Sequence, residues 1–284
     1  MMNSFQSQQV RAEDKSKLAP HRSLSVRGVG VRLGHQIGVG RYSTVYVAQD
    51  EWGTRLAAKV YTEGSAVELW KNELEQLQRF RHPNIVQLVG GFELDAKRYI
   101  LTRYAGISVG RIKLKTQESR GSILRGVAAS LMQALHVIHS RGYLHGDVNP
   151  QNCLYSARGS AAALCLADFT FCRTLQGTSS PLMKQARWMP VPERLDRTLG
   201  GESCATEIYL AALVLLELAT GERLEANVDH TMSGELKRNC ETHPEAFVRA
   251  LAGALALQPQ QRPTAIELWR SLRAASLATT PTLQ

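Results

Sequence analysis

The stretch YLHGDVNPQN, residues 143–152, decides how the rest of the chain is interpreted. It follows a segment with apolar residues at helical spacing, so Asp147 and Asn152 are expected in a loop after a long helix. A carboxylate in such a loop can orient a hydroxyl group and accept its proton, and the amide oxygen of Asn152 can ligate a metal. Asp168 ends a short strand and can bridge a divalent cation to phosphate groups. Each residue alone is more often a turn cap, so their combination carries the prediction.

A glycine turn lies upstream in IGVGRYSTVY, residues 37–46, between two strand-like segments. With glycine at positions 38 and 40, its backbone can approach a ligand closely and its amides can cover phosphate oxygens. Lys59 follows in the strand-like stretch RLAAKVY, residues 55–61. A lysine inside an apolar strand needs an anionic partner, because burying its charge unpaired is costly.

The helix expected over residues 66–80 supplies the carboxylate that can pair with Lys59. Its apolar residues fall on one arc of a helical wheel: Trp70, Leu74, Leu77 and Phe80. Glu73 lies within that arc, whereas Glu75 points the opposite way. We therefore expect Glu73 to pair with Lys59 and Glu75 to remain in solvent.

The composition restricts the class of protein. The chain has 284 residues, 44% of them hydrophobic, and a net charge of +9, so it can bury a sizeable core and favours acidic partners. Five cysteines without a C-x-x-C pair predict neither a disulfide framework nor a zinc site, and fit a reducing compartment. The sequence indicates no secretory signal, and its longest apolar run, residues 209–216, is too short to span a bilayer. No nucleic-acid-binding motif accompanies the positive charge.

Periodicity divides the chain into four parts. Residues 1–30 are basic and polar without apolar periodicity, and we expect a flexible tail able to dock a partner. Residues 31–104 contain short β-like stretches and one helix, which predicts a small strand-rich lobe. Residues 105–276 are mainly helical and predict a larger lobe, followed by a short polar tail over residues 277–284.

Further motifs occur in the order of one family. They are RHPNIVQLVG (residues 81–90), VPE (191–193), EIYLAALVLLELATG (207–221) and RPT (262–264). With these motifs, the chain resembles a eukaryotic-type protein kinase over about residues 33–275. The resemblance implies an α+β, bilobal protein-kinase fold, with a small β-rich N-lobe, a larger α-helical C-lobe and the ATP site between them.

The resemblance also implies a role for each candidate residue. Asp147 would be the catalytic aspartate, and Lys59, paired with Glu73, would hold the α- and β-phosphates of ATP. Asn152 and Asp168 would bind Mg²⁺, with Mn²⁺ as an alternative metal. The residues implied in nucleotide binding are Gly38, Val39, Gly40, Val45, Ala57, Lys59, Thr102, Arg103, Tyr104 and Ala105.

Within that set, Thr102 resembles the residue that guards the back of the adenine pocket in tyrosine kinases. Residues 103–105 would form the hinge whose backbone meets adenine. The resemblance further implies a buried ion pair between Glu193 and Arg262 with a structural role.

Five positions depart from the family pattern. Gly146 replaces the arginine of H-R-D, which suggests activity without a phosphorylated activation loop. Asn149 replaces a lysine near the transferred phosphate, which should weaken transition-state stabilisation. Thr170 replaces the glycine of D-F-G and stiffens that turn, and Ser43 replaces a loop glycine. Glu207 replaces an aspartate of a buried helix and can still brace the catalytic loop.

Three functions remain open from the sequence. The first is an ATP- and Mg²⁺-dependent protein kinase, with serine or threonine of a protein substrate as the favoured acceptor. The second is a pseudokinase scaffold, supported by Gly146, Asn149 and Thr170. The third is a small-molecule kinase, since HGD followed by Asn152 also resembles antibiotic and sugar kinases. We expect a cytoplasmic protein or, alternatively, a bacterial effector delivered into host cells.

Overall fold

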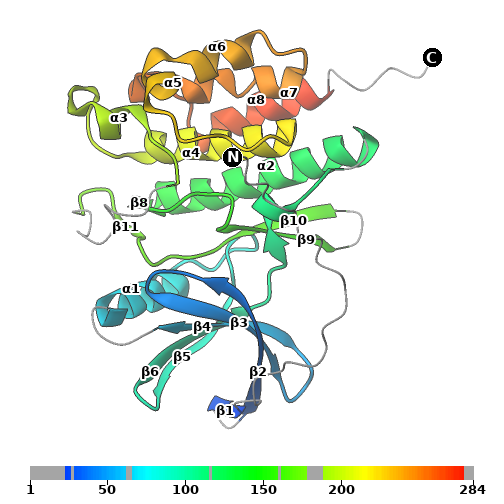
Figure 1. The fold of residues 1–284 in the computed structure, drawn as a ribbon, viewed down its shortest axis with the longest axis vertical. Helices are drawn as coiled ribbons and strands as arrows, with labels where there is room; N and C mark the ends of the chain where they lie inside the picture. Colours follow the sequence, from blue (N-terminus) through cyan, green and yellow to red (C-terminus); the bar gives the residue numbers. More distant parts are fainter. Residues whose placement is uncertain are drawn as a thin grey trace, which may run out of the picture.

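The computed structural model describes residues 23–26, 29–61, 66–114, 117–158, 161–177 and 188–277. The chain folds into a strand-rich part and a larger helical part, which lie one above the other (Figure 1). The connection between them is the short segment after Arg103. This arrangement confirms the predicted α+β, bilobal fold, with a β-rich N-lobe and an α-helical C-lobe.

The N-lobe is built on one antiparallel sheet with the strand order β1-β2-β3-β4-β6-β5. Alternation along the strands separates its two faces, as in β4, where Leu56 and Ala58 are buried in a small apolar core and Lys59 points to the other face. The strands are β1 (Ser23–Val26), β2 (Val29–Val39), β3 (Ser43–Asp50), β4 (Arg55–Tyr61), β5 (Leu88–Leu94) and β6 (Lys97–Arg103).

The structure corrects the predicted N-terminal tail at its C-terminal end. Residues Ser23–Val26 form β1, and Leu24 pairs with Val31 of β2. Backbone pairing with a long neighbouring strand makes this short stretch a strand, although its own pattern is too short to predict one. Residues 1–22 and 27–28 of the predicted tail lie outside the described residues.

Helix α1 (Ala66–Arg79) packs against this sheet. Leu77 and Phe80 are buried, and the indole nitrogen of Trp70 donates a hydrogen bond to the carbonyl oxygen of Tyr99 in β6 at 3.1 Å. The apolar stretch after the helix becomes a strand only from Leu88, where β5 begins. The preceding Ile85 forms a bridge with the C-lobe residue Leu166.

That bridge joins the two lobes. The amide of Leu166 donates to the carbonyl oxygen of Asn84 at 2.8 Å, and the amide of Val86 donates to the carbonyl oxygen of Leu166 at 3.1 Å. The side-chain amide of Asn84 also donates to the carbonyl oxygen of Leu164 at 3.0 Å. These bonds join the segment that follows α1 to β10, the strand that leads to Asp168.

The C-lobe surrounds two long helices, α2 (Gln117–Ser140) and α4 (Cys204–Thr220), which pack against each other. Its strands are β7 (Ile107–Ser108), β8 (Tyr143–Leu144), β9 (Cys153–Arg158), β10 (Ala161–Leu166) and β11 (Arg173–Thr174). The shorter helices and turns are η1 (Val109–Arg111), α3 (Pro192–Leu195), η3 (Arg197–Leu199), α5 (Val228–Ser233), α6 (Glu235–Glu241), α7 (Ala246–Arg249), η4 (Ala252–Leu255), η5 (Pro259–Gln261) and α8 (Ala265–Leu277).

By length and composition, one stretch of the described chain, Arg120–Ser140 in α2, passes a test for a membrane-spanning helix. Leu131, Leu135 and Ile138 on this helix are fully buried, and the helix packs against α4, α8 and β10. We therefore interpret α2 as the central core helix of the C-lobe, since buried helices of this kind pass the same test.

Candidate active site

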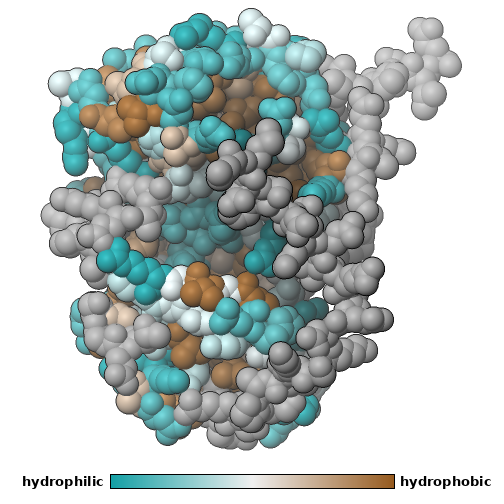
Figure 2. All heavy atoms as spheres, viewed as in Figure 1, coloured by the Kyte–Doolittle hydropathy of each residue, from teal (hydrophilic) through white to brown (hydrophobic). Residues whose placement is uncertain are grey.

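A cavity of about 790 Å³ lies between the lobes. Hydrophilic side chains gather in the recess between the lobes (Figure 2). The structure brings together in this cavity every residue that the sequence predicted for the site: Gly38, Val39, Gly40, Val45, Ala57, Lys59, Glu73, Thr102, Arg103, Tyr104, Ala105, Asp147, Asn152 and Asp168.

Lys59 lies between two carboxylates. Its ammonium nitrogen is 2.7 Å from Glu73 Oε2 and 2.7 Å from Asp168 Oδ1. Burial alone would lower the pKa of Lys59, but the charges of Asp168 and Glu73 raise it well above its ordinary value. Burial would raise the pKa of Asp168, but Lys59 lowers it to about 2. Lys59 and Asp168 are therefore both charged at neutral pH, and Lys59 pairs with Glu73 as the sequence predicted.

The helical-wheel argument separates the two glutamates correctly. Glu73 is 3% exposed, whereas the Glu75 side chain is 62% exposed and pairs with Arg79 on the helix surface. The inward position of Glu73 follows from its place on the buried arc of α1.

Two hydroxyl groups reach the same ion pair, and sequence reasoning missed both. The Thr170 hydroxyl accepts a hydrogen bond from Lys59 Nζ at 2.9 Å and donates one to Glu73 Oε2 at 2.8 Å. The Tyr61 hydroxyl also donates to Glu73 Oε2. Tyr61 stands two residues after Lys59 on one strand, and this i, i+2 spacing could have placed both side chains on the same face.

The loop with the predicted catalytic aspartate is held by its own amides. Asn152 Nδ2 donates to Asp147 Oδ2 at 2.8 Å and to the Asp147 carbonyl oxygen at 2.9 Å. Asn149 Oδ1 accepts from the backbone amides of Gln151 at 2.9 Å and Asn152 at 3.0 Å. Burial and the nearby charge of Asp168 raise the pKa of Asp147 to about 6.

His145 supports this loop as a neutral imidazole. Its Nδ1 accepts a hydrogen bond from the amide of Asp147 at 3.3 Å, which leaves Nε2–H to donate to the Ala167 carbonyl oxygen at 3.0 Å. Burial lowers the pKa of His145, in agreement with a ring that needs one acceptor nitrogen. The ring also packs edge-on against Phe169, with the centroids 4.8 Å apart.

Gly146 and Glu207 form the other side of the loop. Gly146 has a φ of +88°, and a Cβ atom there would lie 2.3 Å from the Phe171 carbonyl oxygen, so a side chain at this position would be strained. Its amide donates to Glu207 Oε1 at 2.6 Å, while His139 donates to Glu207 Oε2 at 2.7 Å. Glu207 thus braces the loop from α4, as its acidic character predicted.

The donor set fits a Mg²⁺ ion. Because Asn152 turns its Nδ2 to Asp147, its Oδ1 remains as a free oxygen ligand, and Asp168 contributes a carboxylate to the same cavity. Oxygen ligands few in number suit Mg²⁺, which keeps waters or takes phosphate oxygens in its remaining positions. No cluster of three His, Cys, Asp or Glu side chains suited to a metal occurs among the described residues. A dedicated cage built by the protein alone is therefore not the arrangement seen in this part of the chain.

The walls of the cavity include apolar residues that the sequence did not single out. Val86, Ile100, Leu154 and Ala167 line it beside the predicted Val45 and Ala57. Such walls suit a flat, largely apolar group, which polar groups at the rim then orient. Leu154 lies two residues beyond Asn152 in β9, so strand alternation is the signal that could have found it.

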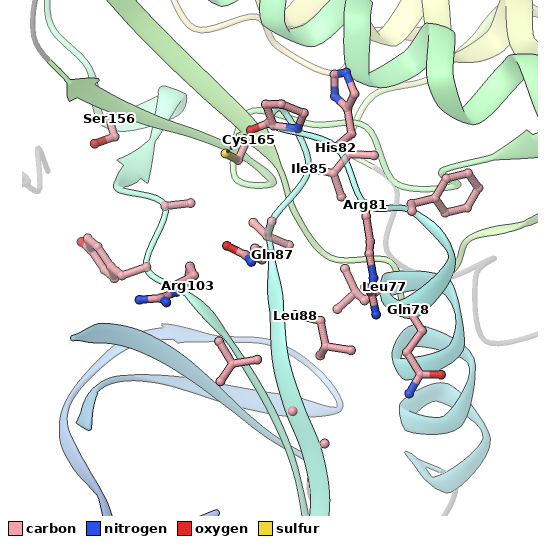
Figure 3. A pocket seen from close by; sticks show the side chains of 18 residues that line it. Leu77, Gln78, Arg81, His82, Ile85, Gln87, Leu88, Arg103, Ser156 and Cys165 are labelled. Carbon is pink, nitrogen blue, oxygen red and sulfur yellow. Dashed lines mark hydrogen bonds between the residues drawn. The ribbon is translucent and has the colours of Figure 1, made fainter. Parts of the chain in front are cut away.

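A second cavity, of about 1050 Å³, lies behind the hinge segment. In Figure 3, Arg103 lies on one side and Arg81 on the other, with Gln87 between them. Arg103, Tyr104 and Ala105 line both cavities, so this short segment lies between them. Cys165 also lines this second cavity, and its thiol donates to the carbonyl oxygen of Pro83 at 3.3 Å.

Comparison with known families agrees with this geometry. The profile of the family described as protein kinase domain matches residues 31–272. The chain belongs to the eukaryotic-type protein kinase family. The match spans both lobes and includes every residue of the candidate site.

Curated relatives of this kinase are distant. Serine/threonine-protein kinase 36 of Pongo abelii is 27% identical over 239 residues, which cover 80% of this chain and 18% of that protein. Calcium/calmodulin-dependent protein kinase cmkA of Emericella nidulans is 27% identical, covering 83% of this chain and 60% of that protein. Tyrosine-protein kinase ABL2 of Mus musculus is 24% identical, covering 70% and 17%. The chain thus spans less than two thirds of each of these relatives.

The kinase also contains the predicted structural ion pair. The guanidinium group of Arg262 donates to both carboxylate oxygens of Glu193 at 2.8 Å, and neither side chain is exposed. The Thr206 hydroxyl donates to Glu193 Oε1 at 2.6 Å. This pair joins the start of α3 to the segment before α8, away from the cleft residues.

Proposed function

We propose that this kinase transfers the γ-phosphoryl group of ATP to a protein hydroxyl in a Mg²⁺-dependent reaction, with serine or threonine as acceptor. The observation that carries the proposal is the convergence of Lys59, Glu73, Asp147, Asn152 and Asp168 on one cavity, with the Lys59–Glu73 pair formed. Ser/Thr acceptors are favoured because serine/threonine-protein kinase 36, at 27% identity, is named for that specificity, whereas the tyrosine kinase ABL2 is less similar at 24%.

In this proposal each residue has one task. Lys59 binds the α- and β-phosphates, and the backbone of residues 103–105 binds adenine against the apolar walls. Asp147 orients the acceptor hydroxyl and accepts its proton as the new oxygen–phosphorus bond forms and the bond to the leaving ADP oxygen breaks. Asn152 and Asp168 hold Mg²⁺, which supplies positive charge to the phosphates.

The hydrogen bonds of Asn149 favour either a slow kinase or, as the alternative, a pseudokinase. Its side chain is committed to the loop through hydrogen bonds with Asp147, Gln151 and Asn152, so it brings no cation to the transferred phosphate. Losing one such stabilising group costs on the order of 10² to 10³ in rate in other enzymes. We expect slow transfer if the proposal is right, and nucleotide binding without transfer if the chain is a pseudokinase.

The test is mass spectrometry of the purified protein and a generic protein substrate after incubation with Mg²⁺ and ATP. The Asp147→Asn variant should lower the transfer rate by about 10² to 10⁴, while ADP still binds, because Asp147 acts on the acceptor and not on the nucleotide. The phosphorylated residue then identifies the acceptor class. Equal phosphate on both proteins would contradict the role of Asp147, and no transfer by the wild type would favour the pseudokinase.

A further inference from the structure

Helix α1 is tied directly to the segment that follows Asp168. The side-chain amide of Asn72, on α1, donates hydrogen bonds to the carbonyl oxygens of Thr170 at 2.9 Å and of Cys172 at 3.0 Å. Asn72 immediately precedes Glu73, so these bonds hold the helix at the point where its functional carboxylate projects.

Thr170 adds a bond from the segment back to the helix. Its hydroxyl is 2.8 Å from Glu73 Oε2 and 2.9 Å from Lys59 Nζ, and the residue is 5% exposed. The Thr170 O–H donates to the Glu73 carboxylate, and the same oxygen accepts from the Lys59 ammonium group. With Glu73 and Asp168, Thr170 therefore uses all three hydrogens of Lys59.

The contacts from Asn72 and Thr170 tie α1 and the segment together from both sides. The Thr170 bonds involve charged groups in a buried site and are stronger than ordinary hydrogen bonds. The Asn72 bonds join the same two elements, which lie about a hundred residues apart in sequence. Moving α1 away from the segment would break all of them together.

We propose that Thr170 and Asn72 are positioning residues that clamp α1 to the segment of residues 168–172 and so stabilise the assembled Lys59–Glu73 pair. The proposal rests on the proposed function for its effect on phosphoryl transfer. The clamp itself is a property of the fold, and it can be tested without turnover.

The first experiment is hydrogen exchange of residues 66–79 and 168–172 in the full chain. Thr170→Val keeps the shape of the side chain and removes the hydroxyl, so amides of α1 should exchange about tenfold faster than in the wild type. Thr170→Ser keeps the hydroxyl and should exchange within about twofold of the wild-type rate. Thr174→Val removes an exposed hydroxyl from β11, just beyond the segment, and should have no effect.

The second experiment measures binding of ADP with Mg²⁺ by calorimetry. If only part of the Thr170→Val population has the pair assembled, the apparent Kd should rise about tenfold, and the KM for ATP should rise more than kcat falls. Thr170→Ser should restore the wild-type Kd. A loss of packing alone would change protein stability without this pattern.

Unchanged exchange of residues 66–79 in Thr170→Val would overturn the clamp. Should that variant fail to fold, Asn72→Ala gives the same test, because it removes the two backbone contacts from a half-buried position. Faster exchange in these variants with no transfer by the wild type would support the clamp and contradict the proposed function.

Discussion

Lys59 and Arg262 are both cations paired with a buried glutamate, but their surroundings differ. All five N–H groups of Arg262 donate: two to Glu193, and three to the carbonyl oxygens of Ala256, Ala205 and Leu257. One cation meets one carboxylate, and neither side chain is exposed. Lys59 instead faces two carboxylates, and the side chain of Asp168 is 34% exposed.

The difference separates a structural ion pair from one that can change partners. The Arg262 pair is neutral and fully bonded, so nothing further can bind to it. The site around Lys59 has two carboxylates for one cation and opens into the cleft, so an arriving cation can bind Asp168 while phosphate oxygens bind Lys59. The same change, cation to methionine, should therefore affect stability at one pair and activity at the other.

Arg262→Met should have the larger effect, on stability. The variant leaves Glu193 buried with the Thr206 hydroxyl as a remaining donor, and breaking a buried pair in this way costs about 3–5 kcal/mol. Chemical denaturation of wild type and variant measures this change in the free energy of unfolding. A loss below about 1 kcal/mol would show that water or a rearranged loop replaces the arginine, and that the pair is not a structural anchor.

Lys59→Met should have the next largest effect, on phosphoryl transfer. Removing one charged group that binds the phosphates of ATP should lower the transfer rate by about 10² to 10³. The loss of stability should be smaller than in Arg262→Met, because Glu73 keeps the Tyr61 and Thr170 hydroxyl donors and Asp168 can turn to solvent. Transfer assays and chemical denaturation of the same preparation test the expected loss of rate and the expected loss of stability. A variant that unfolds as readily as Arg262→Met would contradict the comparison.

The two pairs also show which features of the site could be predicted from sequence. Lys59 and Glu73 follow from local periodicity, since an apolar strand buries its lysine and a helical wheel turns one glutamate inward. Glu193 and Arg262 came only from the family resemblance. Asp147, Asn152 and Asp168 came from side-chain chemistry and spacing within short loops.

Contacts between distant elements could not be predicted in this way. Thr170 contacts Glu73 although 97 positions separate them in sequence. Its hydroxyl finds this partner only when α1 and the segment after Asp168 pack together. The late start of β5 has the same origin, since Ile85 pairs with Leu166 of the other lobe. Likewise, β1 exists because the edge of β2 offers backbone partners. In each case tertiary contacts decide the local structure.

A third buried pair, His139 with Glu207, sharpens the comparison because its cation loses its charge at mildly basic pH. Burial alone would lower the pKa of His139, but hydrogen bonds with Cys204 and Glu207 raise it to about 9, from 6.5. A raised pKa stabilises the fold fully below pH 6.5, and this stability is lost as the pH rises through 9. The loss should approach about 3 kcal/mol, from 1.36 kcal/mol for each unit of pKa.

The measurement is Tm against pH, from about pH 6 to about pH 10, for the wild type and His139→Gln. Glutamine can still donate a hydrogen bond to Glu207 but does not titrate in this range, so the variant should lose less stability at high pH. Because Glu207 also accepts from the amide of Gly146, transfer activity should fall with the same pH dependence in the wild type alone. Equal slopes of Tm against pH for the two proteins would mean that His139 is neutral in the folded state. Glu207 would then hold the catalytic loop without a charged partner.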